Sequence, residues 1–172
     1  MDKRLSHSEK TKKRQKRNLK DRHGWNTLDD YNHIYHNYLD NHPFLDHTKP
    51  LPEFTYYLSE ENKDVYVVLD GYIYCNNDIV VEIKKTFETR IVASGILKIR
   101  CILYCYNAYI KANRCILRYD NIDKLSDYHK HTFNSDGQEL SRVSITRQQF
   151  PLLHEFIDEL QKLCIIKSET GI

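Results

Sequence analysis

Two strand-like runs joined by a turn fill Val65–Phe87, which reads VYVVLDGYIYCNNDIVVEIKKTF. β-Branched and aromatic residues dominate both runs, as is typical of strands. Gly71 is expected to break the first run, because glycine weakens a strand interior. The intervening Asn76-Asn77-Asp78 has the composition of a turn, so the second run is expected to pair back on the first.

Further strand-like segments follow this pair at short intervals along the chain. They are Ile96–Ile110, in which apolar and polar residues alternate imperfectly, then Cys115–Tyr119, His129–Phe133 and Leu140–Val143. Short polar connections between consecutive strands favour antiparallel pairing of neighbours in sequence. The sequence therefore predicts an α+β fold built on an antiparallel meander.

An amphipathic helix is the clearest element of the C-terminal end. Thr146 and Gln149 have the spacing of a capping box, and Pro151 follows in the expected first turn, where its missing N–H costs little. An apolar stripe then recurs at helical spacing, at Phe150, Leu153, Ile157, Leu160 and Cys164. Such a stripe needs a surface to cover, so we expect this helix to pack on the sheet.

The N-terminal third has a different character. A helix is expected over residues 27–41, with Thr27 as the N-cap, and a proline-rich loop over residues 42–52. We therefore divide the chain into a basic arm at 1–26, a helical and loop extension at 27–60, and a core domain at 61–172.

Composition restricts the class of protein. The chain has 172 residues with 40% hydrophobic and 29% charged content, which suits one globular domain. No apolar run approaches the roughly 18 residues of a membrane span, and no apolar segment follows the basic N-terminus as in a signal peptide. The five cysteines are odd in number and lie mostly in strand-like runs, as expected of buried thiols in a reducing compartment. We expect a cytoplasmic protein that contacts no membrane and needs no cofactor.

Positive charge is concentrated at the N-terminus. Residues 1–22 carry ten basic and three acidic side chains, a net charge of +7, whereas the remainder carries sixteen and twenty-one, a net charge of −5. Such an arm favours a polyanion such as RNA, and it is equally consistent with a solvated tail. The candidate RNA-binding residues of the arm are Lys12, Lys13, Arg14, Lys16 and Arg17.

Chemically useful side chains occur on two consecutive strands. Residues two apart share a face of a strand, so Arg118 and Asp120 share one face and His129 and His131 share another. If the strands are neighbours, one polar surface presents a guanidinium, a carboxylate and two imidazoles. These groups suit phosphodiester cleavage, since imidazoles can transfer protons near neutral pH and arginine can hold a phosphate. Lys130, between the histidines, points to the opposite face and is a further candidate for contact with RNA.

Two other interpretations of these residues stay open. Two imidazoles and a carboxylate suit a bound metal ion. Alternatively, Arg118 and Asp120 form a structural ion pair, and the histidines are polar residues of an outer face. We take Arg118, Asp120, His129 and His131 as the candidate catalytic residues of a metal-free site.

The order of these motifs resembles a known family. Arg118-Tyr119-Asp120-Asn121 at a strand end, a short spacer, His129-Lys130-His131 and a C-terminal helix resemble the TumE-type toxins of bacterial and archaeal toxin–antitoxin systems. The resemblance covers roughly residues 64–164. It implies a small toxin that acts on RNA and is neutralised by an antitoxin protein encoded nearby. The resulting hypothesis is a metal-independent endoribonuclease, and the alternative is a non-enzymatic module that binds a protein or the ribosome through the sheet and the arm.

Overall fold

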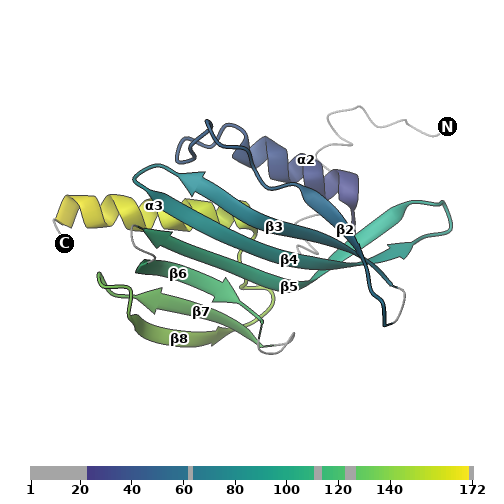
Figure 1. Ribbon diagram of the computed structural model, residues 1–172. Helices are drawn as coiled ribbons and strands as arrows, with labels where there is room; N and C mark the ends of the chain where they lie inside the picture. Colours follow the sequence, from purple (N-terminus) through teal and green to yellow (C-terminus); the bar gives the residue numbers. More distant parts are fainter. Residues whose placement is uncertain (1–22, 62–63, 111–113, 123–126, 171–172) are drawn as a thin grey trace, which may run out of the picture.

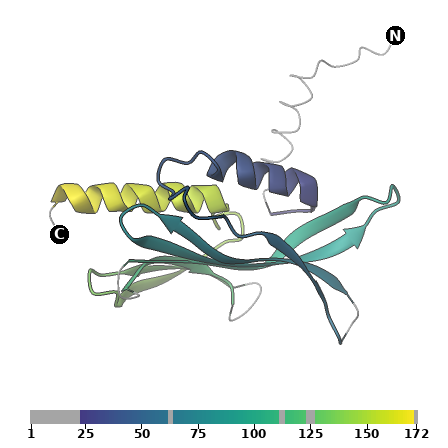
Figure 2. The same cartoon turned by 45° about the horizontal axis from the view of Figure 1, so that its top comes forward.

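A computed structural model describes residues 23–61, 64–110, 114–122 and 127–170 of the chain. It contains one antiparallel sheet with two helices packed on the same face (Figures 1 and 2). The elements are β1 (Asn26–Thr27), α2 (Leu28–Leu39), β2 (Phe54–Leu58), β3 (Val65–Cys75), β4 (Ile79–Ile91), β5 (Leu97–Ile110), β6 (Arg114–Asp120), β7 (Tyr128–Phe133), β8 (Glu139–Ile145) and α3 (Leu153–Thr170). The predicted α+β class, with an antiparallel meander covered by a C-terminal helix, is confirmed.

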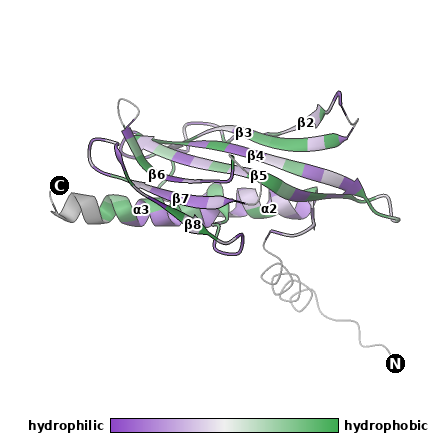
Figure 3. Cartoon of the chain, turned by 90° about the horizontal axis from the view of Figure 1, so that it is seen from below, coloured by the Kyte–Doolittle hydropathy of each residue, from purple (hydrophilic) through white to green (hydrophobic). Residues whose placement is uncertain are grey.

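The sheet follows the order of the chain. Strands β2 to β8 are hydrogen-bonded to their neighbours in sequence, and only β1 lies off this path, beside β5. Helices α2 and α3 bury the face that carries most of the core, which we call the helix face. The opposite face, which we call the open face, has no helix over it among the described residues (Figure 3).

Gly71 does not break β3, contrary to the sequence-based expectation. The strand continues through it and pairs with β4 from Tyr66 to Cys75. A Cβ at Gly71 would lie 3.1 Å from two ring carbons of Pro52, and its φ is +152°. Glycine at this position therefore lets the loop before β2 pass close to the strand.

Strand β2 was not predicted, and it extends the sheet by one strand. Phe54 lies opposite Leu69 of β3, and its ring contacts the rings of Tyr31 and Phe87 on the helix face. The sequence pattern assigns Phe54–Leu58 to the extension at 27–60 and predicts no strand there. The tyrosines of this segment are exposed at the edge of the sheet, so it lacks the buried alternation that identifies most strands.

A β-bulge explains the imperfect alternation in β5. Thr86 lies opposite Leu103 and Phe87 lies opposite Cys101, so Ile102 is an extra residue on β5. The bulge shifts the alternation by one residue, and both Cys101 and Tyr104 are thereby buried on the helix face.

Helix α2 agrees with the sequence prediction. Thr27 adopts extended backbone and its hydroxyl accepts a hydrogen bond from the Asp30 amide at 3.0 Å, as an N-cap does. The helix buries Tyr35 and Leu39 against the sheet.

Helix α3 begins later than predicted. Gln149 does reach back to the Thr146 amide at 2.9 Å, but this capping box closes an isolated turn, and the helix starts at Leu153. The residue before a proline disfavours helical backbone, so Pro151 ends that turn. Glu155 accepts a hydrogen bond from the Leu152 amide at 2.8 Å and caps the true start. The predicted apolar stripe is confirmed, with Phe150, Leu153, Ile157 and Leu160 buried and Cys164 packed at the edge of the core.

Candidate functional site

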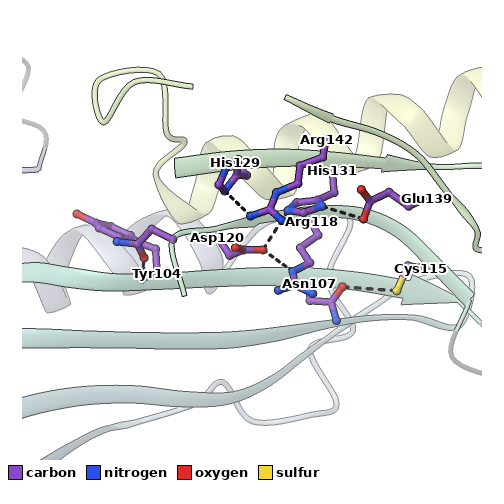
Figure 4. A network of polar contacts seen from close by, with 10 residues as sticks. Tyr104, Asn107, Cys115, Arg118, Asp120, His129, His131, Glu139 and Arg142 are labelled. Atoms are coloured by element: carbon purple, nitrogen blue, oxygen red, sulfur yellow. Dashed lines mark hydrogen bonds and ion pairs between the residues drawn. The ribbon is translucent and has the colours of Figure 1, made fainter. Parts of the chain in front are cut away.

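Strands β6 and β7 are neighbours, and their register brings the four candidate catalytic residues together. Arg118 lies opposite His131, and Asp120 lies opposite His129. Residues directly opposite in an antiparallel pair point to the same face, which here is the open face. Figure 4 shows the four side chains in one network of polar contacts.

Asp120 is the most deeply buried member of the site, with only 1% of its surface exposed. Its Oδ2 accepts a hydrogen bond from the Arg118 Nε at 2.5 Å. Partial burial disfavours the charged guanidinium, but attraction to Asp120 and this hydrogen bond outweigh that effect and raise the pKa of Arg118 above its ordinary value. The Arg118 side chain is 36% exposed, so the rest of its guanidinium reaches the surface.

His131 lies between two carboxylates. Its Nδ1 is 3.0 Å from Oε2 of Glu139, and its Nε2 is 3.3 Å from Oδ2 of Asp120. The second contact lacks hydrogen-bond alignment, so this buried nitrogen has no hydrogen-bond partner among the described residues. A ring with a proton on each nitrogen would face a carboxylate oxygen on both sides.

His129 has a different environment. Nη2 of Arg142 lies 3.1 Å from Nδ1, and Oδ1 of Asp127 lies 3.1 Å from Nε2. A guanidinium can only donate, so Nδ1 must accept and the ring proton belongs on Nε2, facing the carboxylate. The carboxylate thus holds the tautomer in which Nδ1 carries a lone pair.

The two imidazoles are more buried than the sequence indicated. His129 and His131 are 6% and 5% exposed, respectively, although an outer polar face was expected. The flanking strand β8 contributes Arg142 opposite His131, and this arginine and Glu139 contact the rings. The rim of the site is more accessible, since the side chains of Glu139 and Asp127 are 46% and 45% exposed.

Sequence reasoning missed three members of this network, Asp127, Glu139 and Arg142. The last two come from β8, which was predicted only as a strand. The turn over residues 134–138 makes β8 the next partner of β7, but a bulge between Thr132 and Phe133 shifts the register, so the turn alone could not identify Arg142 as the residue opposite His131. Asp127 lies two residues before His129 and shares its face by simple alternation.

The other two residues of the Arg-Tyr-Asp-Asn motif are structural. The Tyr119 hydroxyl donates to Glu159 of α3 at 2.8 Å on the helix face. Asn121 accepts from the Tyr104 amide at 2.7 Å and donates to the Ile102 carbonyl at 2.9 Å. It therefore attaches the end of β6 to the bulge of β5.

Lys130 points to the helix face, away from the other site residues. Its Nζ lies 2.6 Å from Oε1 of Glu159 and 5.4 Å from the ring centre of Tyr119. Contact between Lys130 and RNA stays a prediction, and it would involve the opposite side of the sheet from the histidines. The arm residues Lys12, Lys13, Arg14, Lys16 and Arg17 lie outside the described residues.

The alternative of a metal site gains no support from this geometry. In the part of the chain that the structure describes, no group of three His, Cys, Asp or Glu side chains has the arrangement of a metal site. Asp120, His129 and His131 are directed to partners within the network instead. A search of the described helices also finds none that is long and apolar enough to cross a membrane.

Comparison of the chain with family models, with curated proteins and with solved structures finds no match. The resemblance to TumE-type toxins therefore rests on the two motifs and their order.

Proposed function

We propose that this protein is the toxin of a toxin–antitoxin pair and cleaves RNA without a metal ion, at the site formed by Arg118, Asp120, His129 and His131. The observation that supports this most is the unequal pairing of the two imidazoles. His129 has a lone pair on Nδ1, and His131 faces carboxylates with both nitrogens. Their ring centres are 6.0 Å apart, so one ring can act as a base and the other as an acid on a single phosphodiester.

The reaction follows from these roles. The ribose 2′-hydroxyl loses its proton to Nδ1 of His129 while its oxygen bonds to phosphorus. The bond from phosphorus to the 5′-oxygen breaks, and this oxygen takes a proton from His131. The products are a 2′,3′-cyclic phosphate and a 5′-hydroxyl, and no water or metal ion takes part in this step.

The arginines and carboxylates prepare the site. Arg118 reaches the surface beyond Asp120 and can hold a non-bridging phosphate oxygen, which stabilises the charge of the transition state. In the free protein, Arg142 donates a hydrogen bond to Nδ1 of His129, so the lone pair of this nitrogen is already used. A phosphate that attracts Arg142 would release this nitrogen to accept the proton. Asp120 positions Arg118 and His131 and does not itself contact the substrate.

The test is cleavage of total RNA by the full chain in the presence of a chelator, followed by assay of variants. We expect His129→Ala, His131→Ala and Arg118→Ala each to lower the rate by about 10²–10⁴-fold, as loss of a proton-transfer or charge-stabilising group does. Products ending in a cyclic phosphate should accumulate. Because the imidazoles are buried, the fold of each variant is checked by circular dichroism.

Lys130→Ala is the matched control, since this residue lies between the histidines and points to the other face. At saturating RNA it should retain the cleavage rate of the unchanged protein, because its predicted contact with RNA would change only the affinity. The proposed chemistry would be contradicted if all three site variants kept the cleavage rate of the parent. It would also be contradicted if Lys130→Ala lost as much of this rate as they do. Activity that vanishes with a chelator and returns with a divalent ion would also contradict it.

One observation favours a second candidate function, a binding module without catalysis. The two imidazoles are nearly buried and contact other protein groups, as in a structural network. If the protein is such a module, neither the parent nor the folded variants would cleave RNA, and both would bind the same partner. A short adjacent gene for a DNA-binding or small helical protein would favour the toxin, because an antitoxin is its expected partner.

The basic arm has its own test. Deleting residues 1–22 removes a net charge of +7 and almost no apolar area, so the core should keep its thermal stability while RNA affinity falls. RNA affinity of the full chain should also fall steeply with salt. A flat salt dependence would show that the arm does not hold RNA.

A further inference from the structure

Lys85 is a buried lysine on the helix face, whereas the histidine site lies on the open face. It lies opposite Leu69 and Tyr104 in the sheet and is 1% exposed. Its Nζ donates to the hydroxyl of Tyr106 at 2.8 Å and to that of Tyr31. It lies between 5.0 and 5.5 Å from four ring centres, those of Tyr31, Phe87, Tyr104 and Tyr106.

The charge of this lysine is not neutralised within the described residues. No carboxylate among them forms an ion pair with it, and burial raises the pKa of Tyr31 and Tyr106, which keeps both phenols neutral. Burial also raises the pKa of the neighbouring Cys101 thiol to about 11. An ammonium has three N–H donors, of which the two phenols use two. Four rings and two phenols surround the ammonium, and its third N–H has no partner among the described residues, so it can still donate to an anion that arrives from outside.

A second cation lies close to the same region. Arg147 donates through Nη2 to the carbonyls of His23 and Cys101. Its buried Nε has no hydrogen-bond partner among the described residues. The interior beside Lys85 is therefore rich in donors and positive charge.

Two hollows lie beside this region and share part of their walls. The smaller, about 10 Å³, has Lys85, Cys101 and Tyr104 in its wall, and is large enough for about one water molecule or one carboxylate oxygen. The larger, about 70 Å³, lies between α2 and α3, which share one side of the sheet (Figure 2). Both hollows share three wall residues, Asn26, Tyr31 and Leu152.

The larger hollow is lined mainly by apolar groups. Its wall includes Ile34, Leu39 and Leu153, and the ring of Tyr38 stacks on His154 at its side with 4.3 Å between ring centres. Its volume is about half of the 150 Å³ that accommodates benzene in an engineered apolar cavity. The hollow is partly open to solvent, so a short hydrocarbon chain can fill it and extend beyond it.

We propose that the space between α2, α3 and the sheet binds a small monocarboxylate with a short apolar tail. The carboxylate would accept hydrogen bonds from Lys85 and from the hydroxyl of Tyr31. The tail would lie between the two helices, against Ile34 and Leu153. This site is separate from the histidine site and independent of the function proposed there.

The test is an NMR titration of the ¹⁵N-labelled full chain with hexanoate and, separately, with 1-hexanol, which has the same chain without the charge. We expect hexanoate to shift the amide signals of Tyr31 and Leu152 and to bind about ten- to a hundredfold more tightly than hexanol, as a charge-assisted hydrogen bond gives. Equal affinity for the two compounds, or no binding of hexanoate at millimolar concentration, would overturn the proposal. This comparison needs no variant.

A pair of variants adds a second measurement. Lys85→Met removes the charge and keeps the length of the side chain, and it should abolish the preference for hexanoate while hexanol binds as before. Lys84→Met is the matched control, because Lys84 is exposed on the open face, where it pairs with Glu82 at 2.8 Å. Undiminished hexanoate affinity in folded Lys85→Met would also overturn the proposal.

Discussion

Replacing Asp120 by Asn should destabilise the fold, although the substitution changes one atom and keeps the volume. Among the described residues, Asp120 is the one carboxylate that contacts both Arg118 and His131. The neutral amide gives up the attraction to Arg118 and can place an N–H donor against the Arg118 Nε–H, which also donates. We expect both a lower free energy of unfolding and a lower cleavage rate, measured by urea unfolding with circular dichroism and by RNA cleavage.

The magnitude follows from burial. Removing one partner of a buried ion pair costs about 3–5 kcal/mol. The Asp120 side chain is 2% exposed, but that of Arg118 is 36% exposed and can be hydrated when its partner is lost. We therefore expect a loss of about 2–3 kcal/mol, between the values for buried and exposed pairs. For a chain of this size that corresponds to a fall in melting temperature of about 2–4 °C per kcal/mol.

Glu139→Gln is the matched control. Glu139 contacts the same imidazole at 3.0 Å, but its side chain is 46% exposed, so its loss should cost less than about 1 kcal/mol. A double-mutant cycle of Asp120→Asn with Arg118→Met should give a coupling free energy of at least about 1 kcal/mol. Equal stability of Asp120→Asn and Glu139→Gln, or additive effects in the cycle, would refute the view that Asp120 organises the site.

Three further outcomes are expected. Gly71→Ala places a Cβ 3.1 Å from the Pro52 ring and should lower the urea midpoint, with a cost of about 1–3 kcal/mol; an unchanged midpoint would show that the loop can move away. Phe150→Ala removes a fully buried ring beside the rings of four tyrosines and should cost about 3–5 kcal/mol in the same assay, and a loss below about 1 kcal/mol would contradict its central place in the core. Burial raises the pKa of Cys101 and Cys105 from 9.0 to about 11, so the unfolded chain releases these protons first; stability should be intact below about pH 9 and fall as the pH rises through about 11, and a flat urea midpoint over this range would argue against it.

The elements of the fold were largely predictable because they depend on local patterns. Thr27 starts α2 as its cap predicts, and the apolar stripe of α3 is buried as its spacing predicts. Errors occurred where two local signals competed. The Thr146 capping box was correctly recognised, but Pro151 ended the turn before a helix could grow from it.

The sequence predicted which four residues form the candidate site, but it did not predict their burial or their contacts with β8. Alternation placed Arg118 and Asp120 on one face, and the pairing of β6 with β7 brought them to the histidines. Burial of the imidazoles depends on Arg142 and Glu139 from β8, whose register is set by a bulge at the end of the pair and is invisible in composition. Lys85 gave no sequence signal at all, since a lysine in a strand is usually exposed and its burial results from the rings around it.

Strands β2 to β8 have the same order in the sheet as in the chain, and this affects how the protein folds during synthesis. Chains fold from the N-terminal side during synthesis, and pairs that are close in sequence form quickly. Strands β2 to β8 can therefore join one after another as each leaves the ribosome. Phe150 and helix α3 come last, although they cover the helix face. Until α3 is synthesised, the part of the helix face that α2 does not cover stays exposed to solvent, so the nascent chain is most prone to aggregation at this late stage.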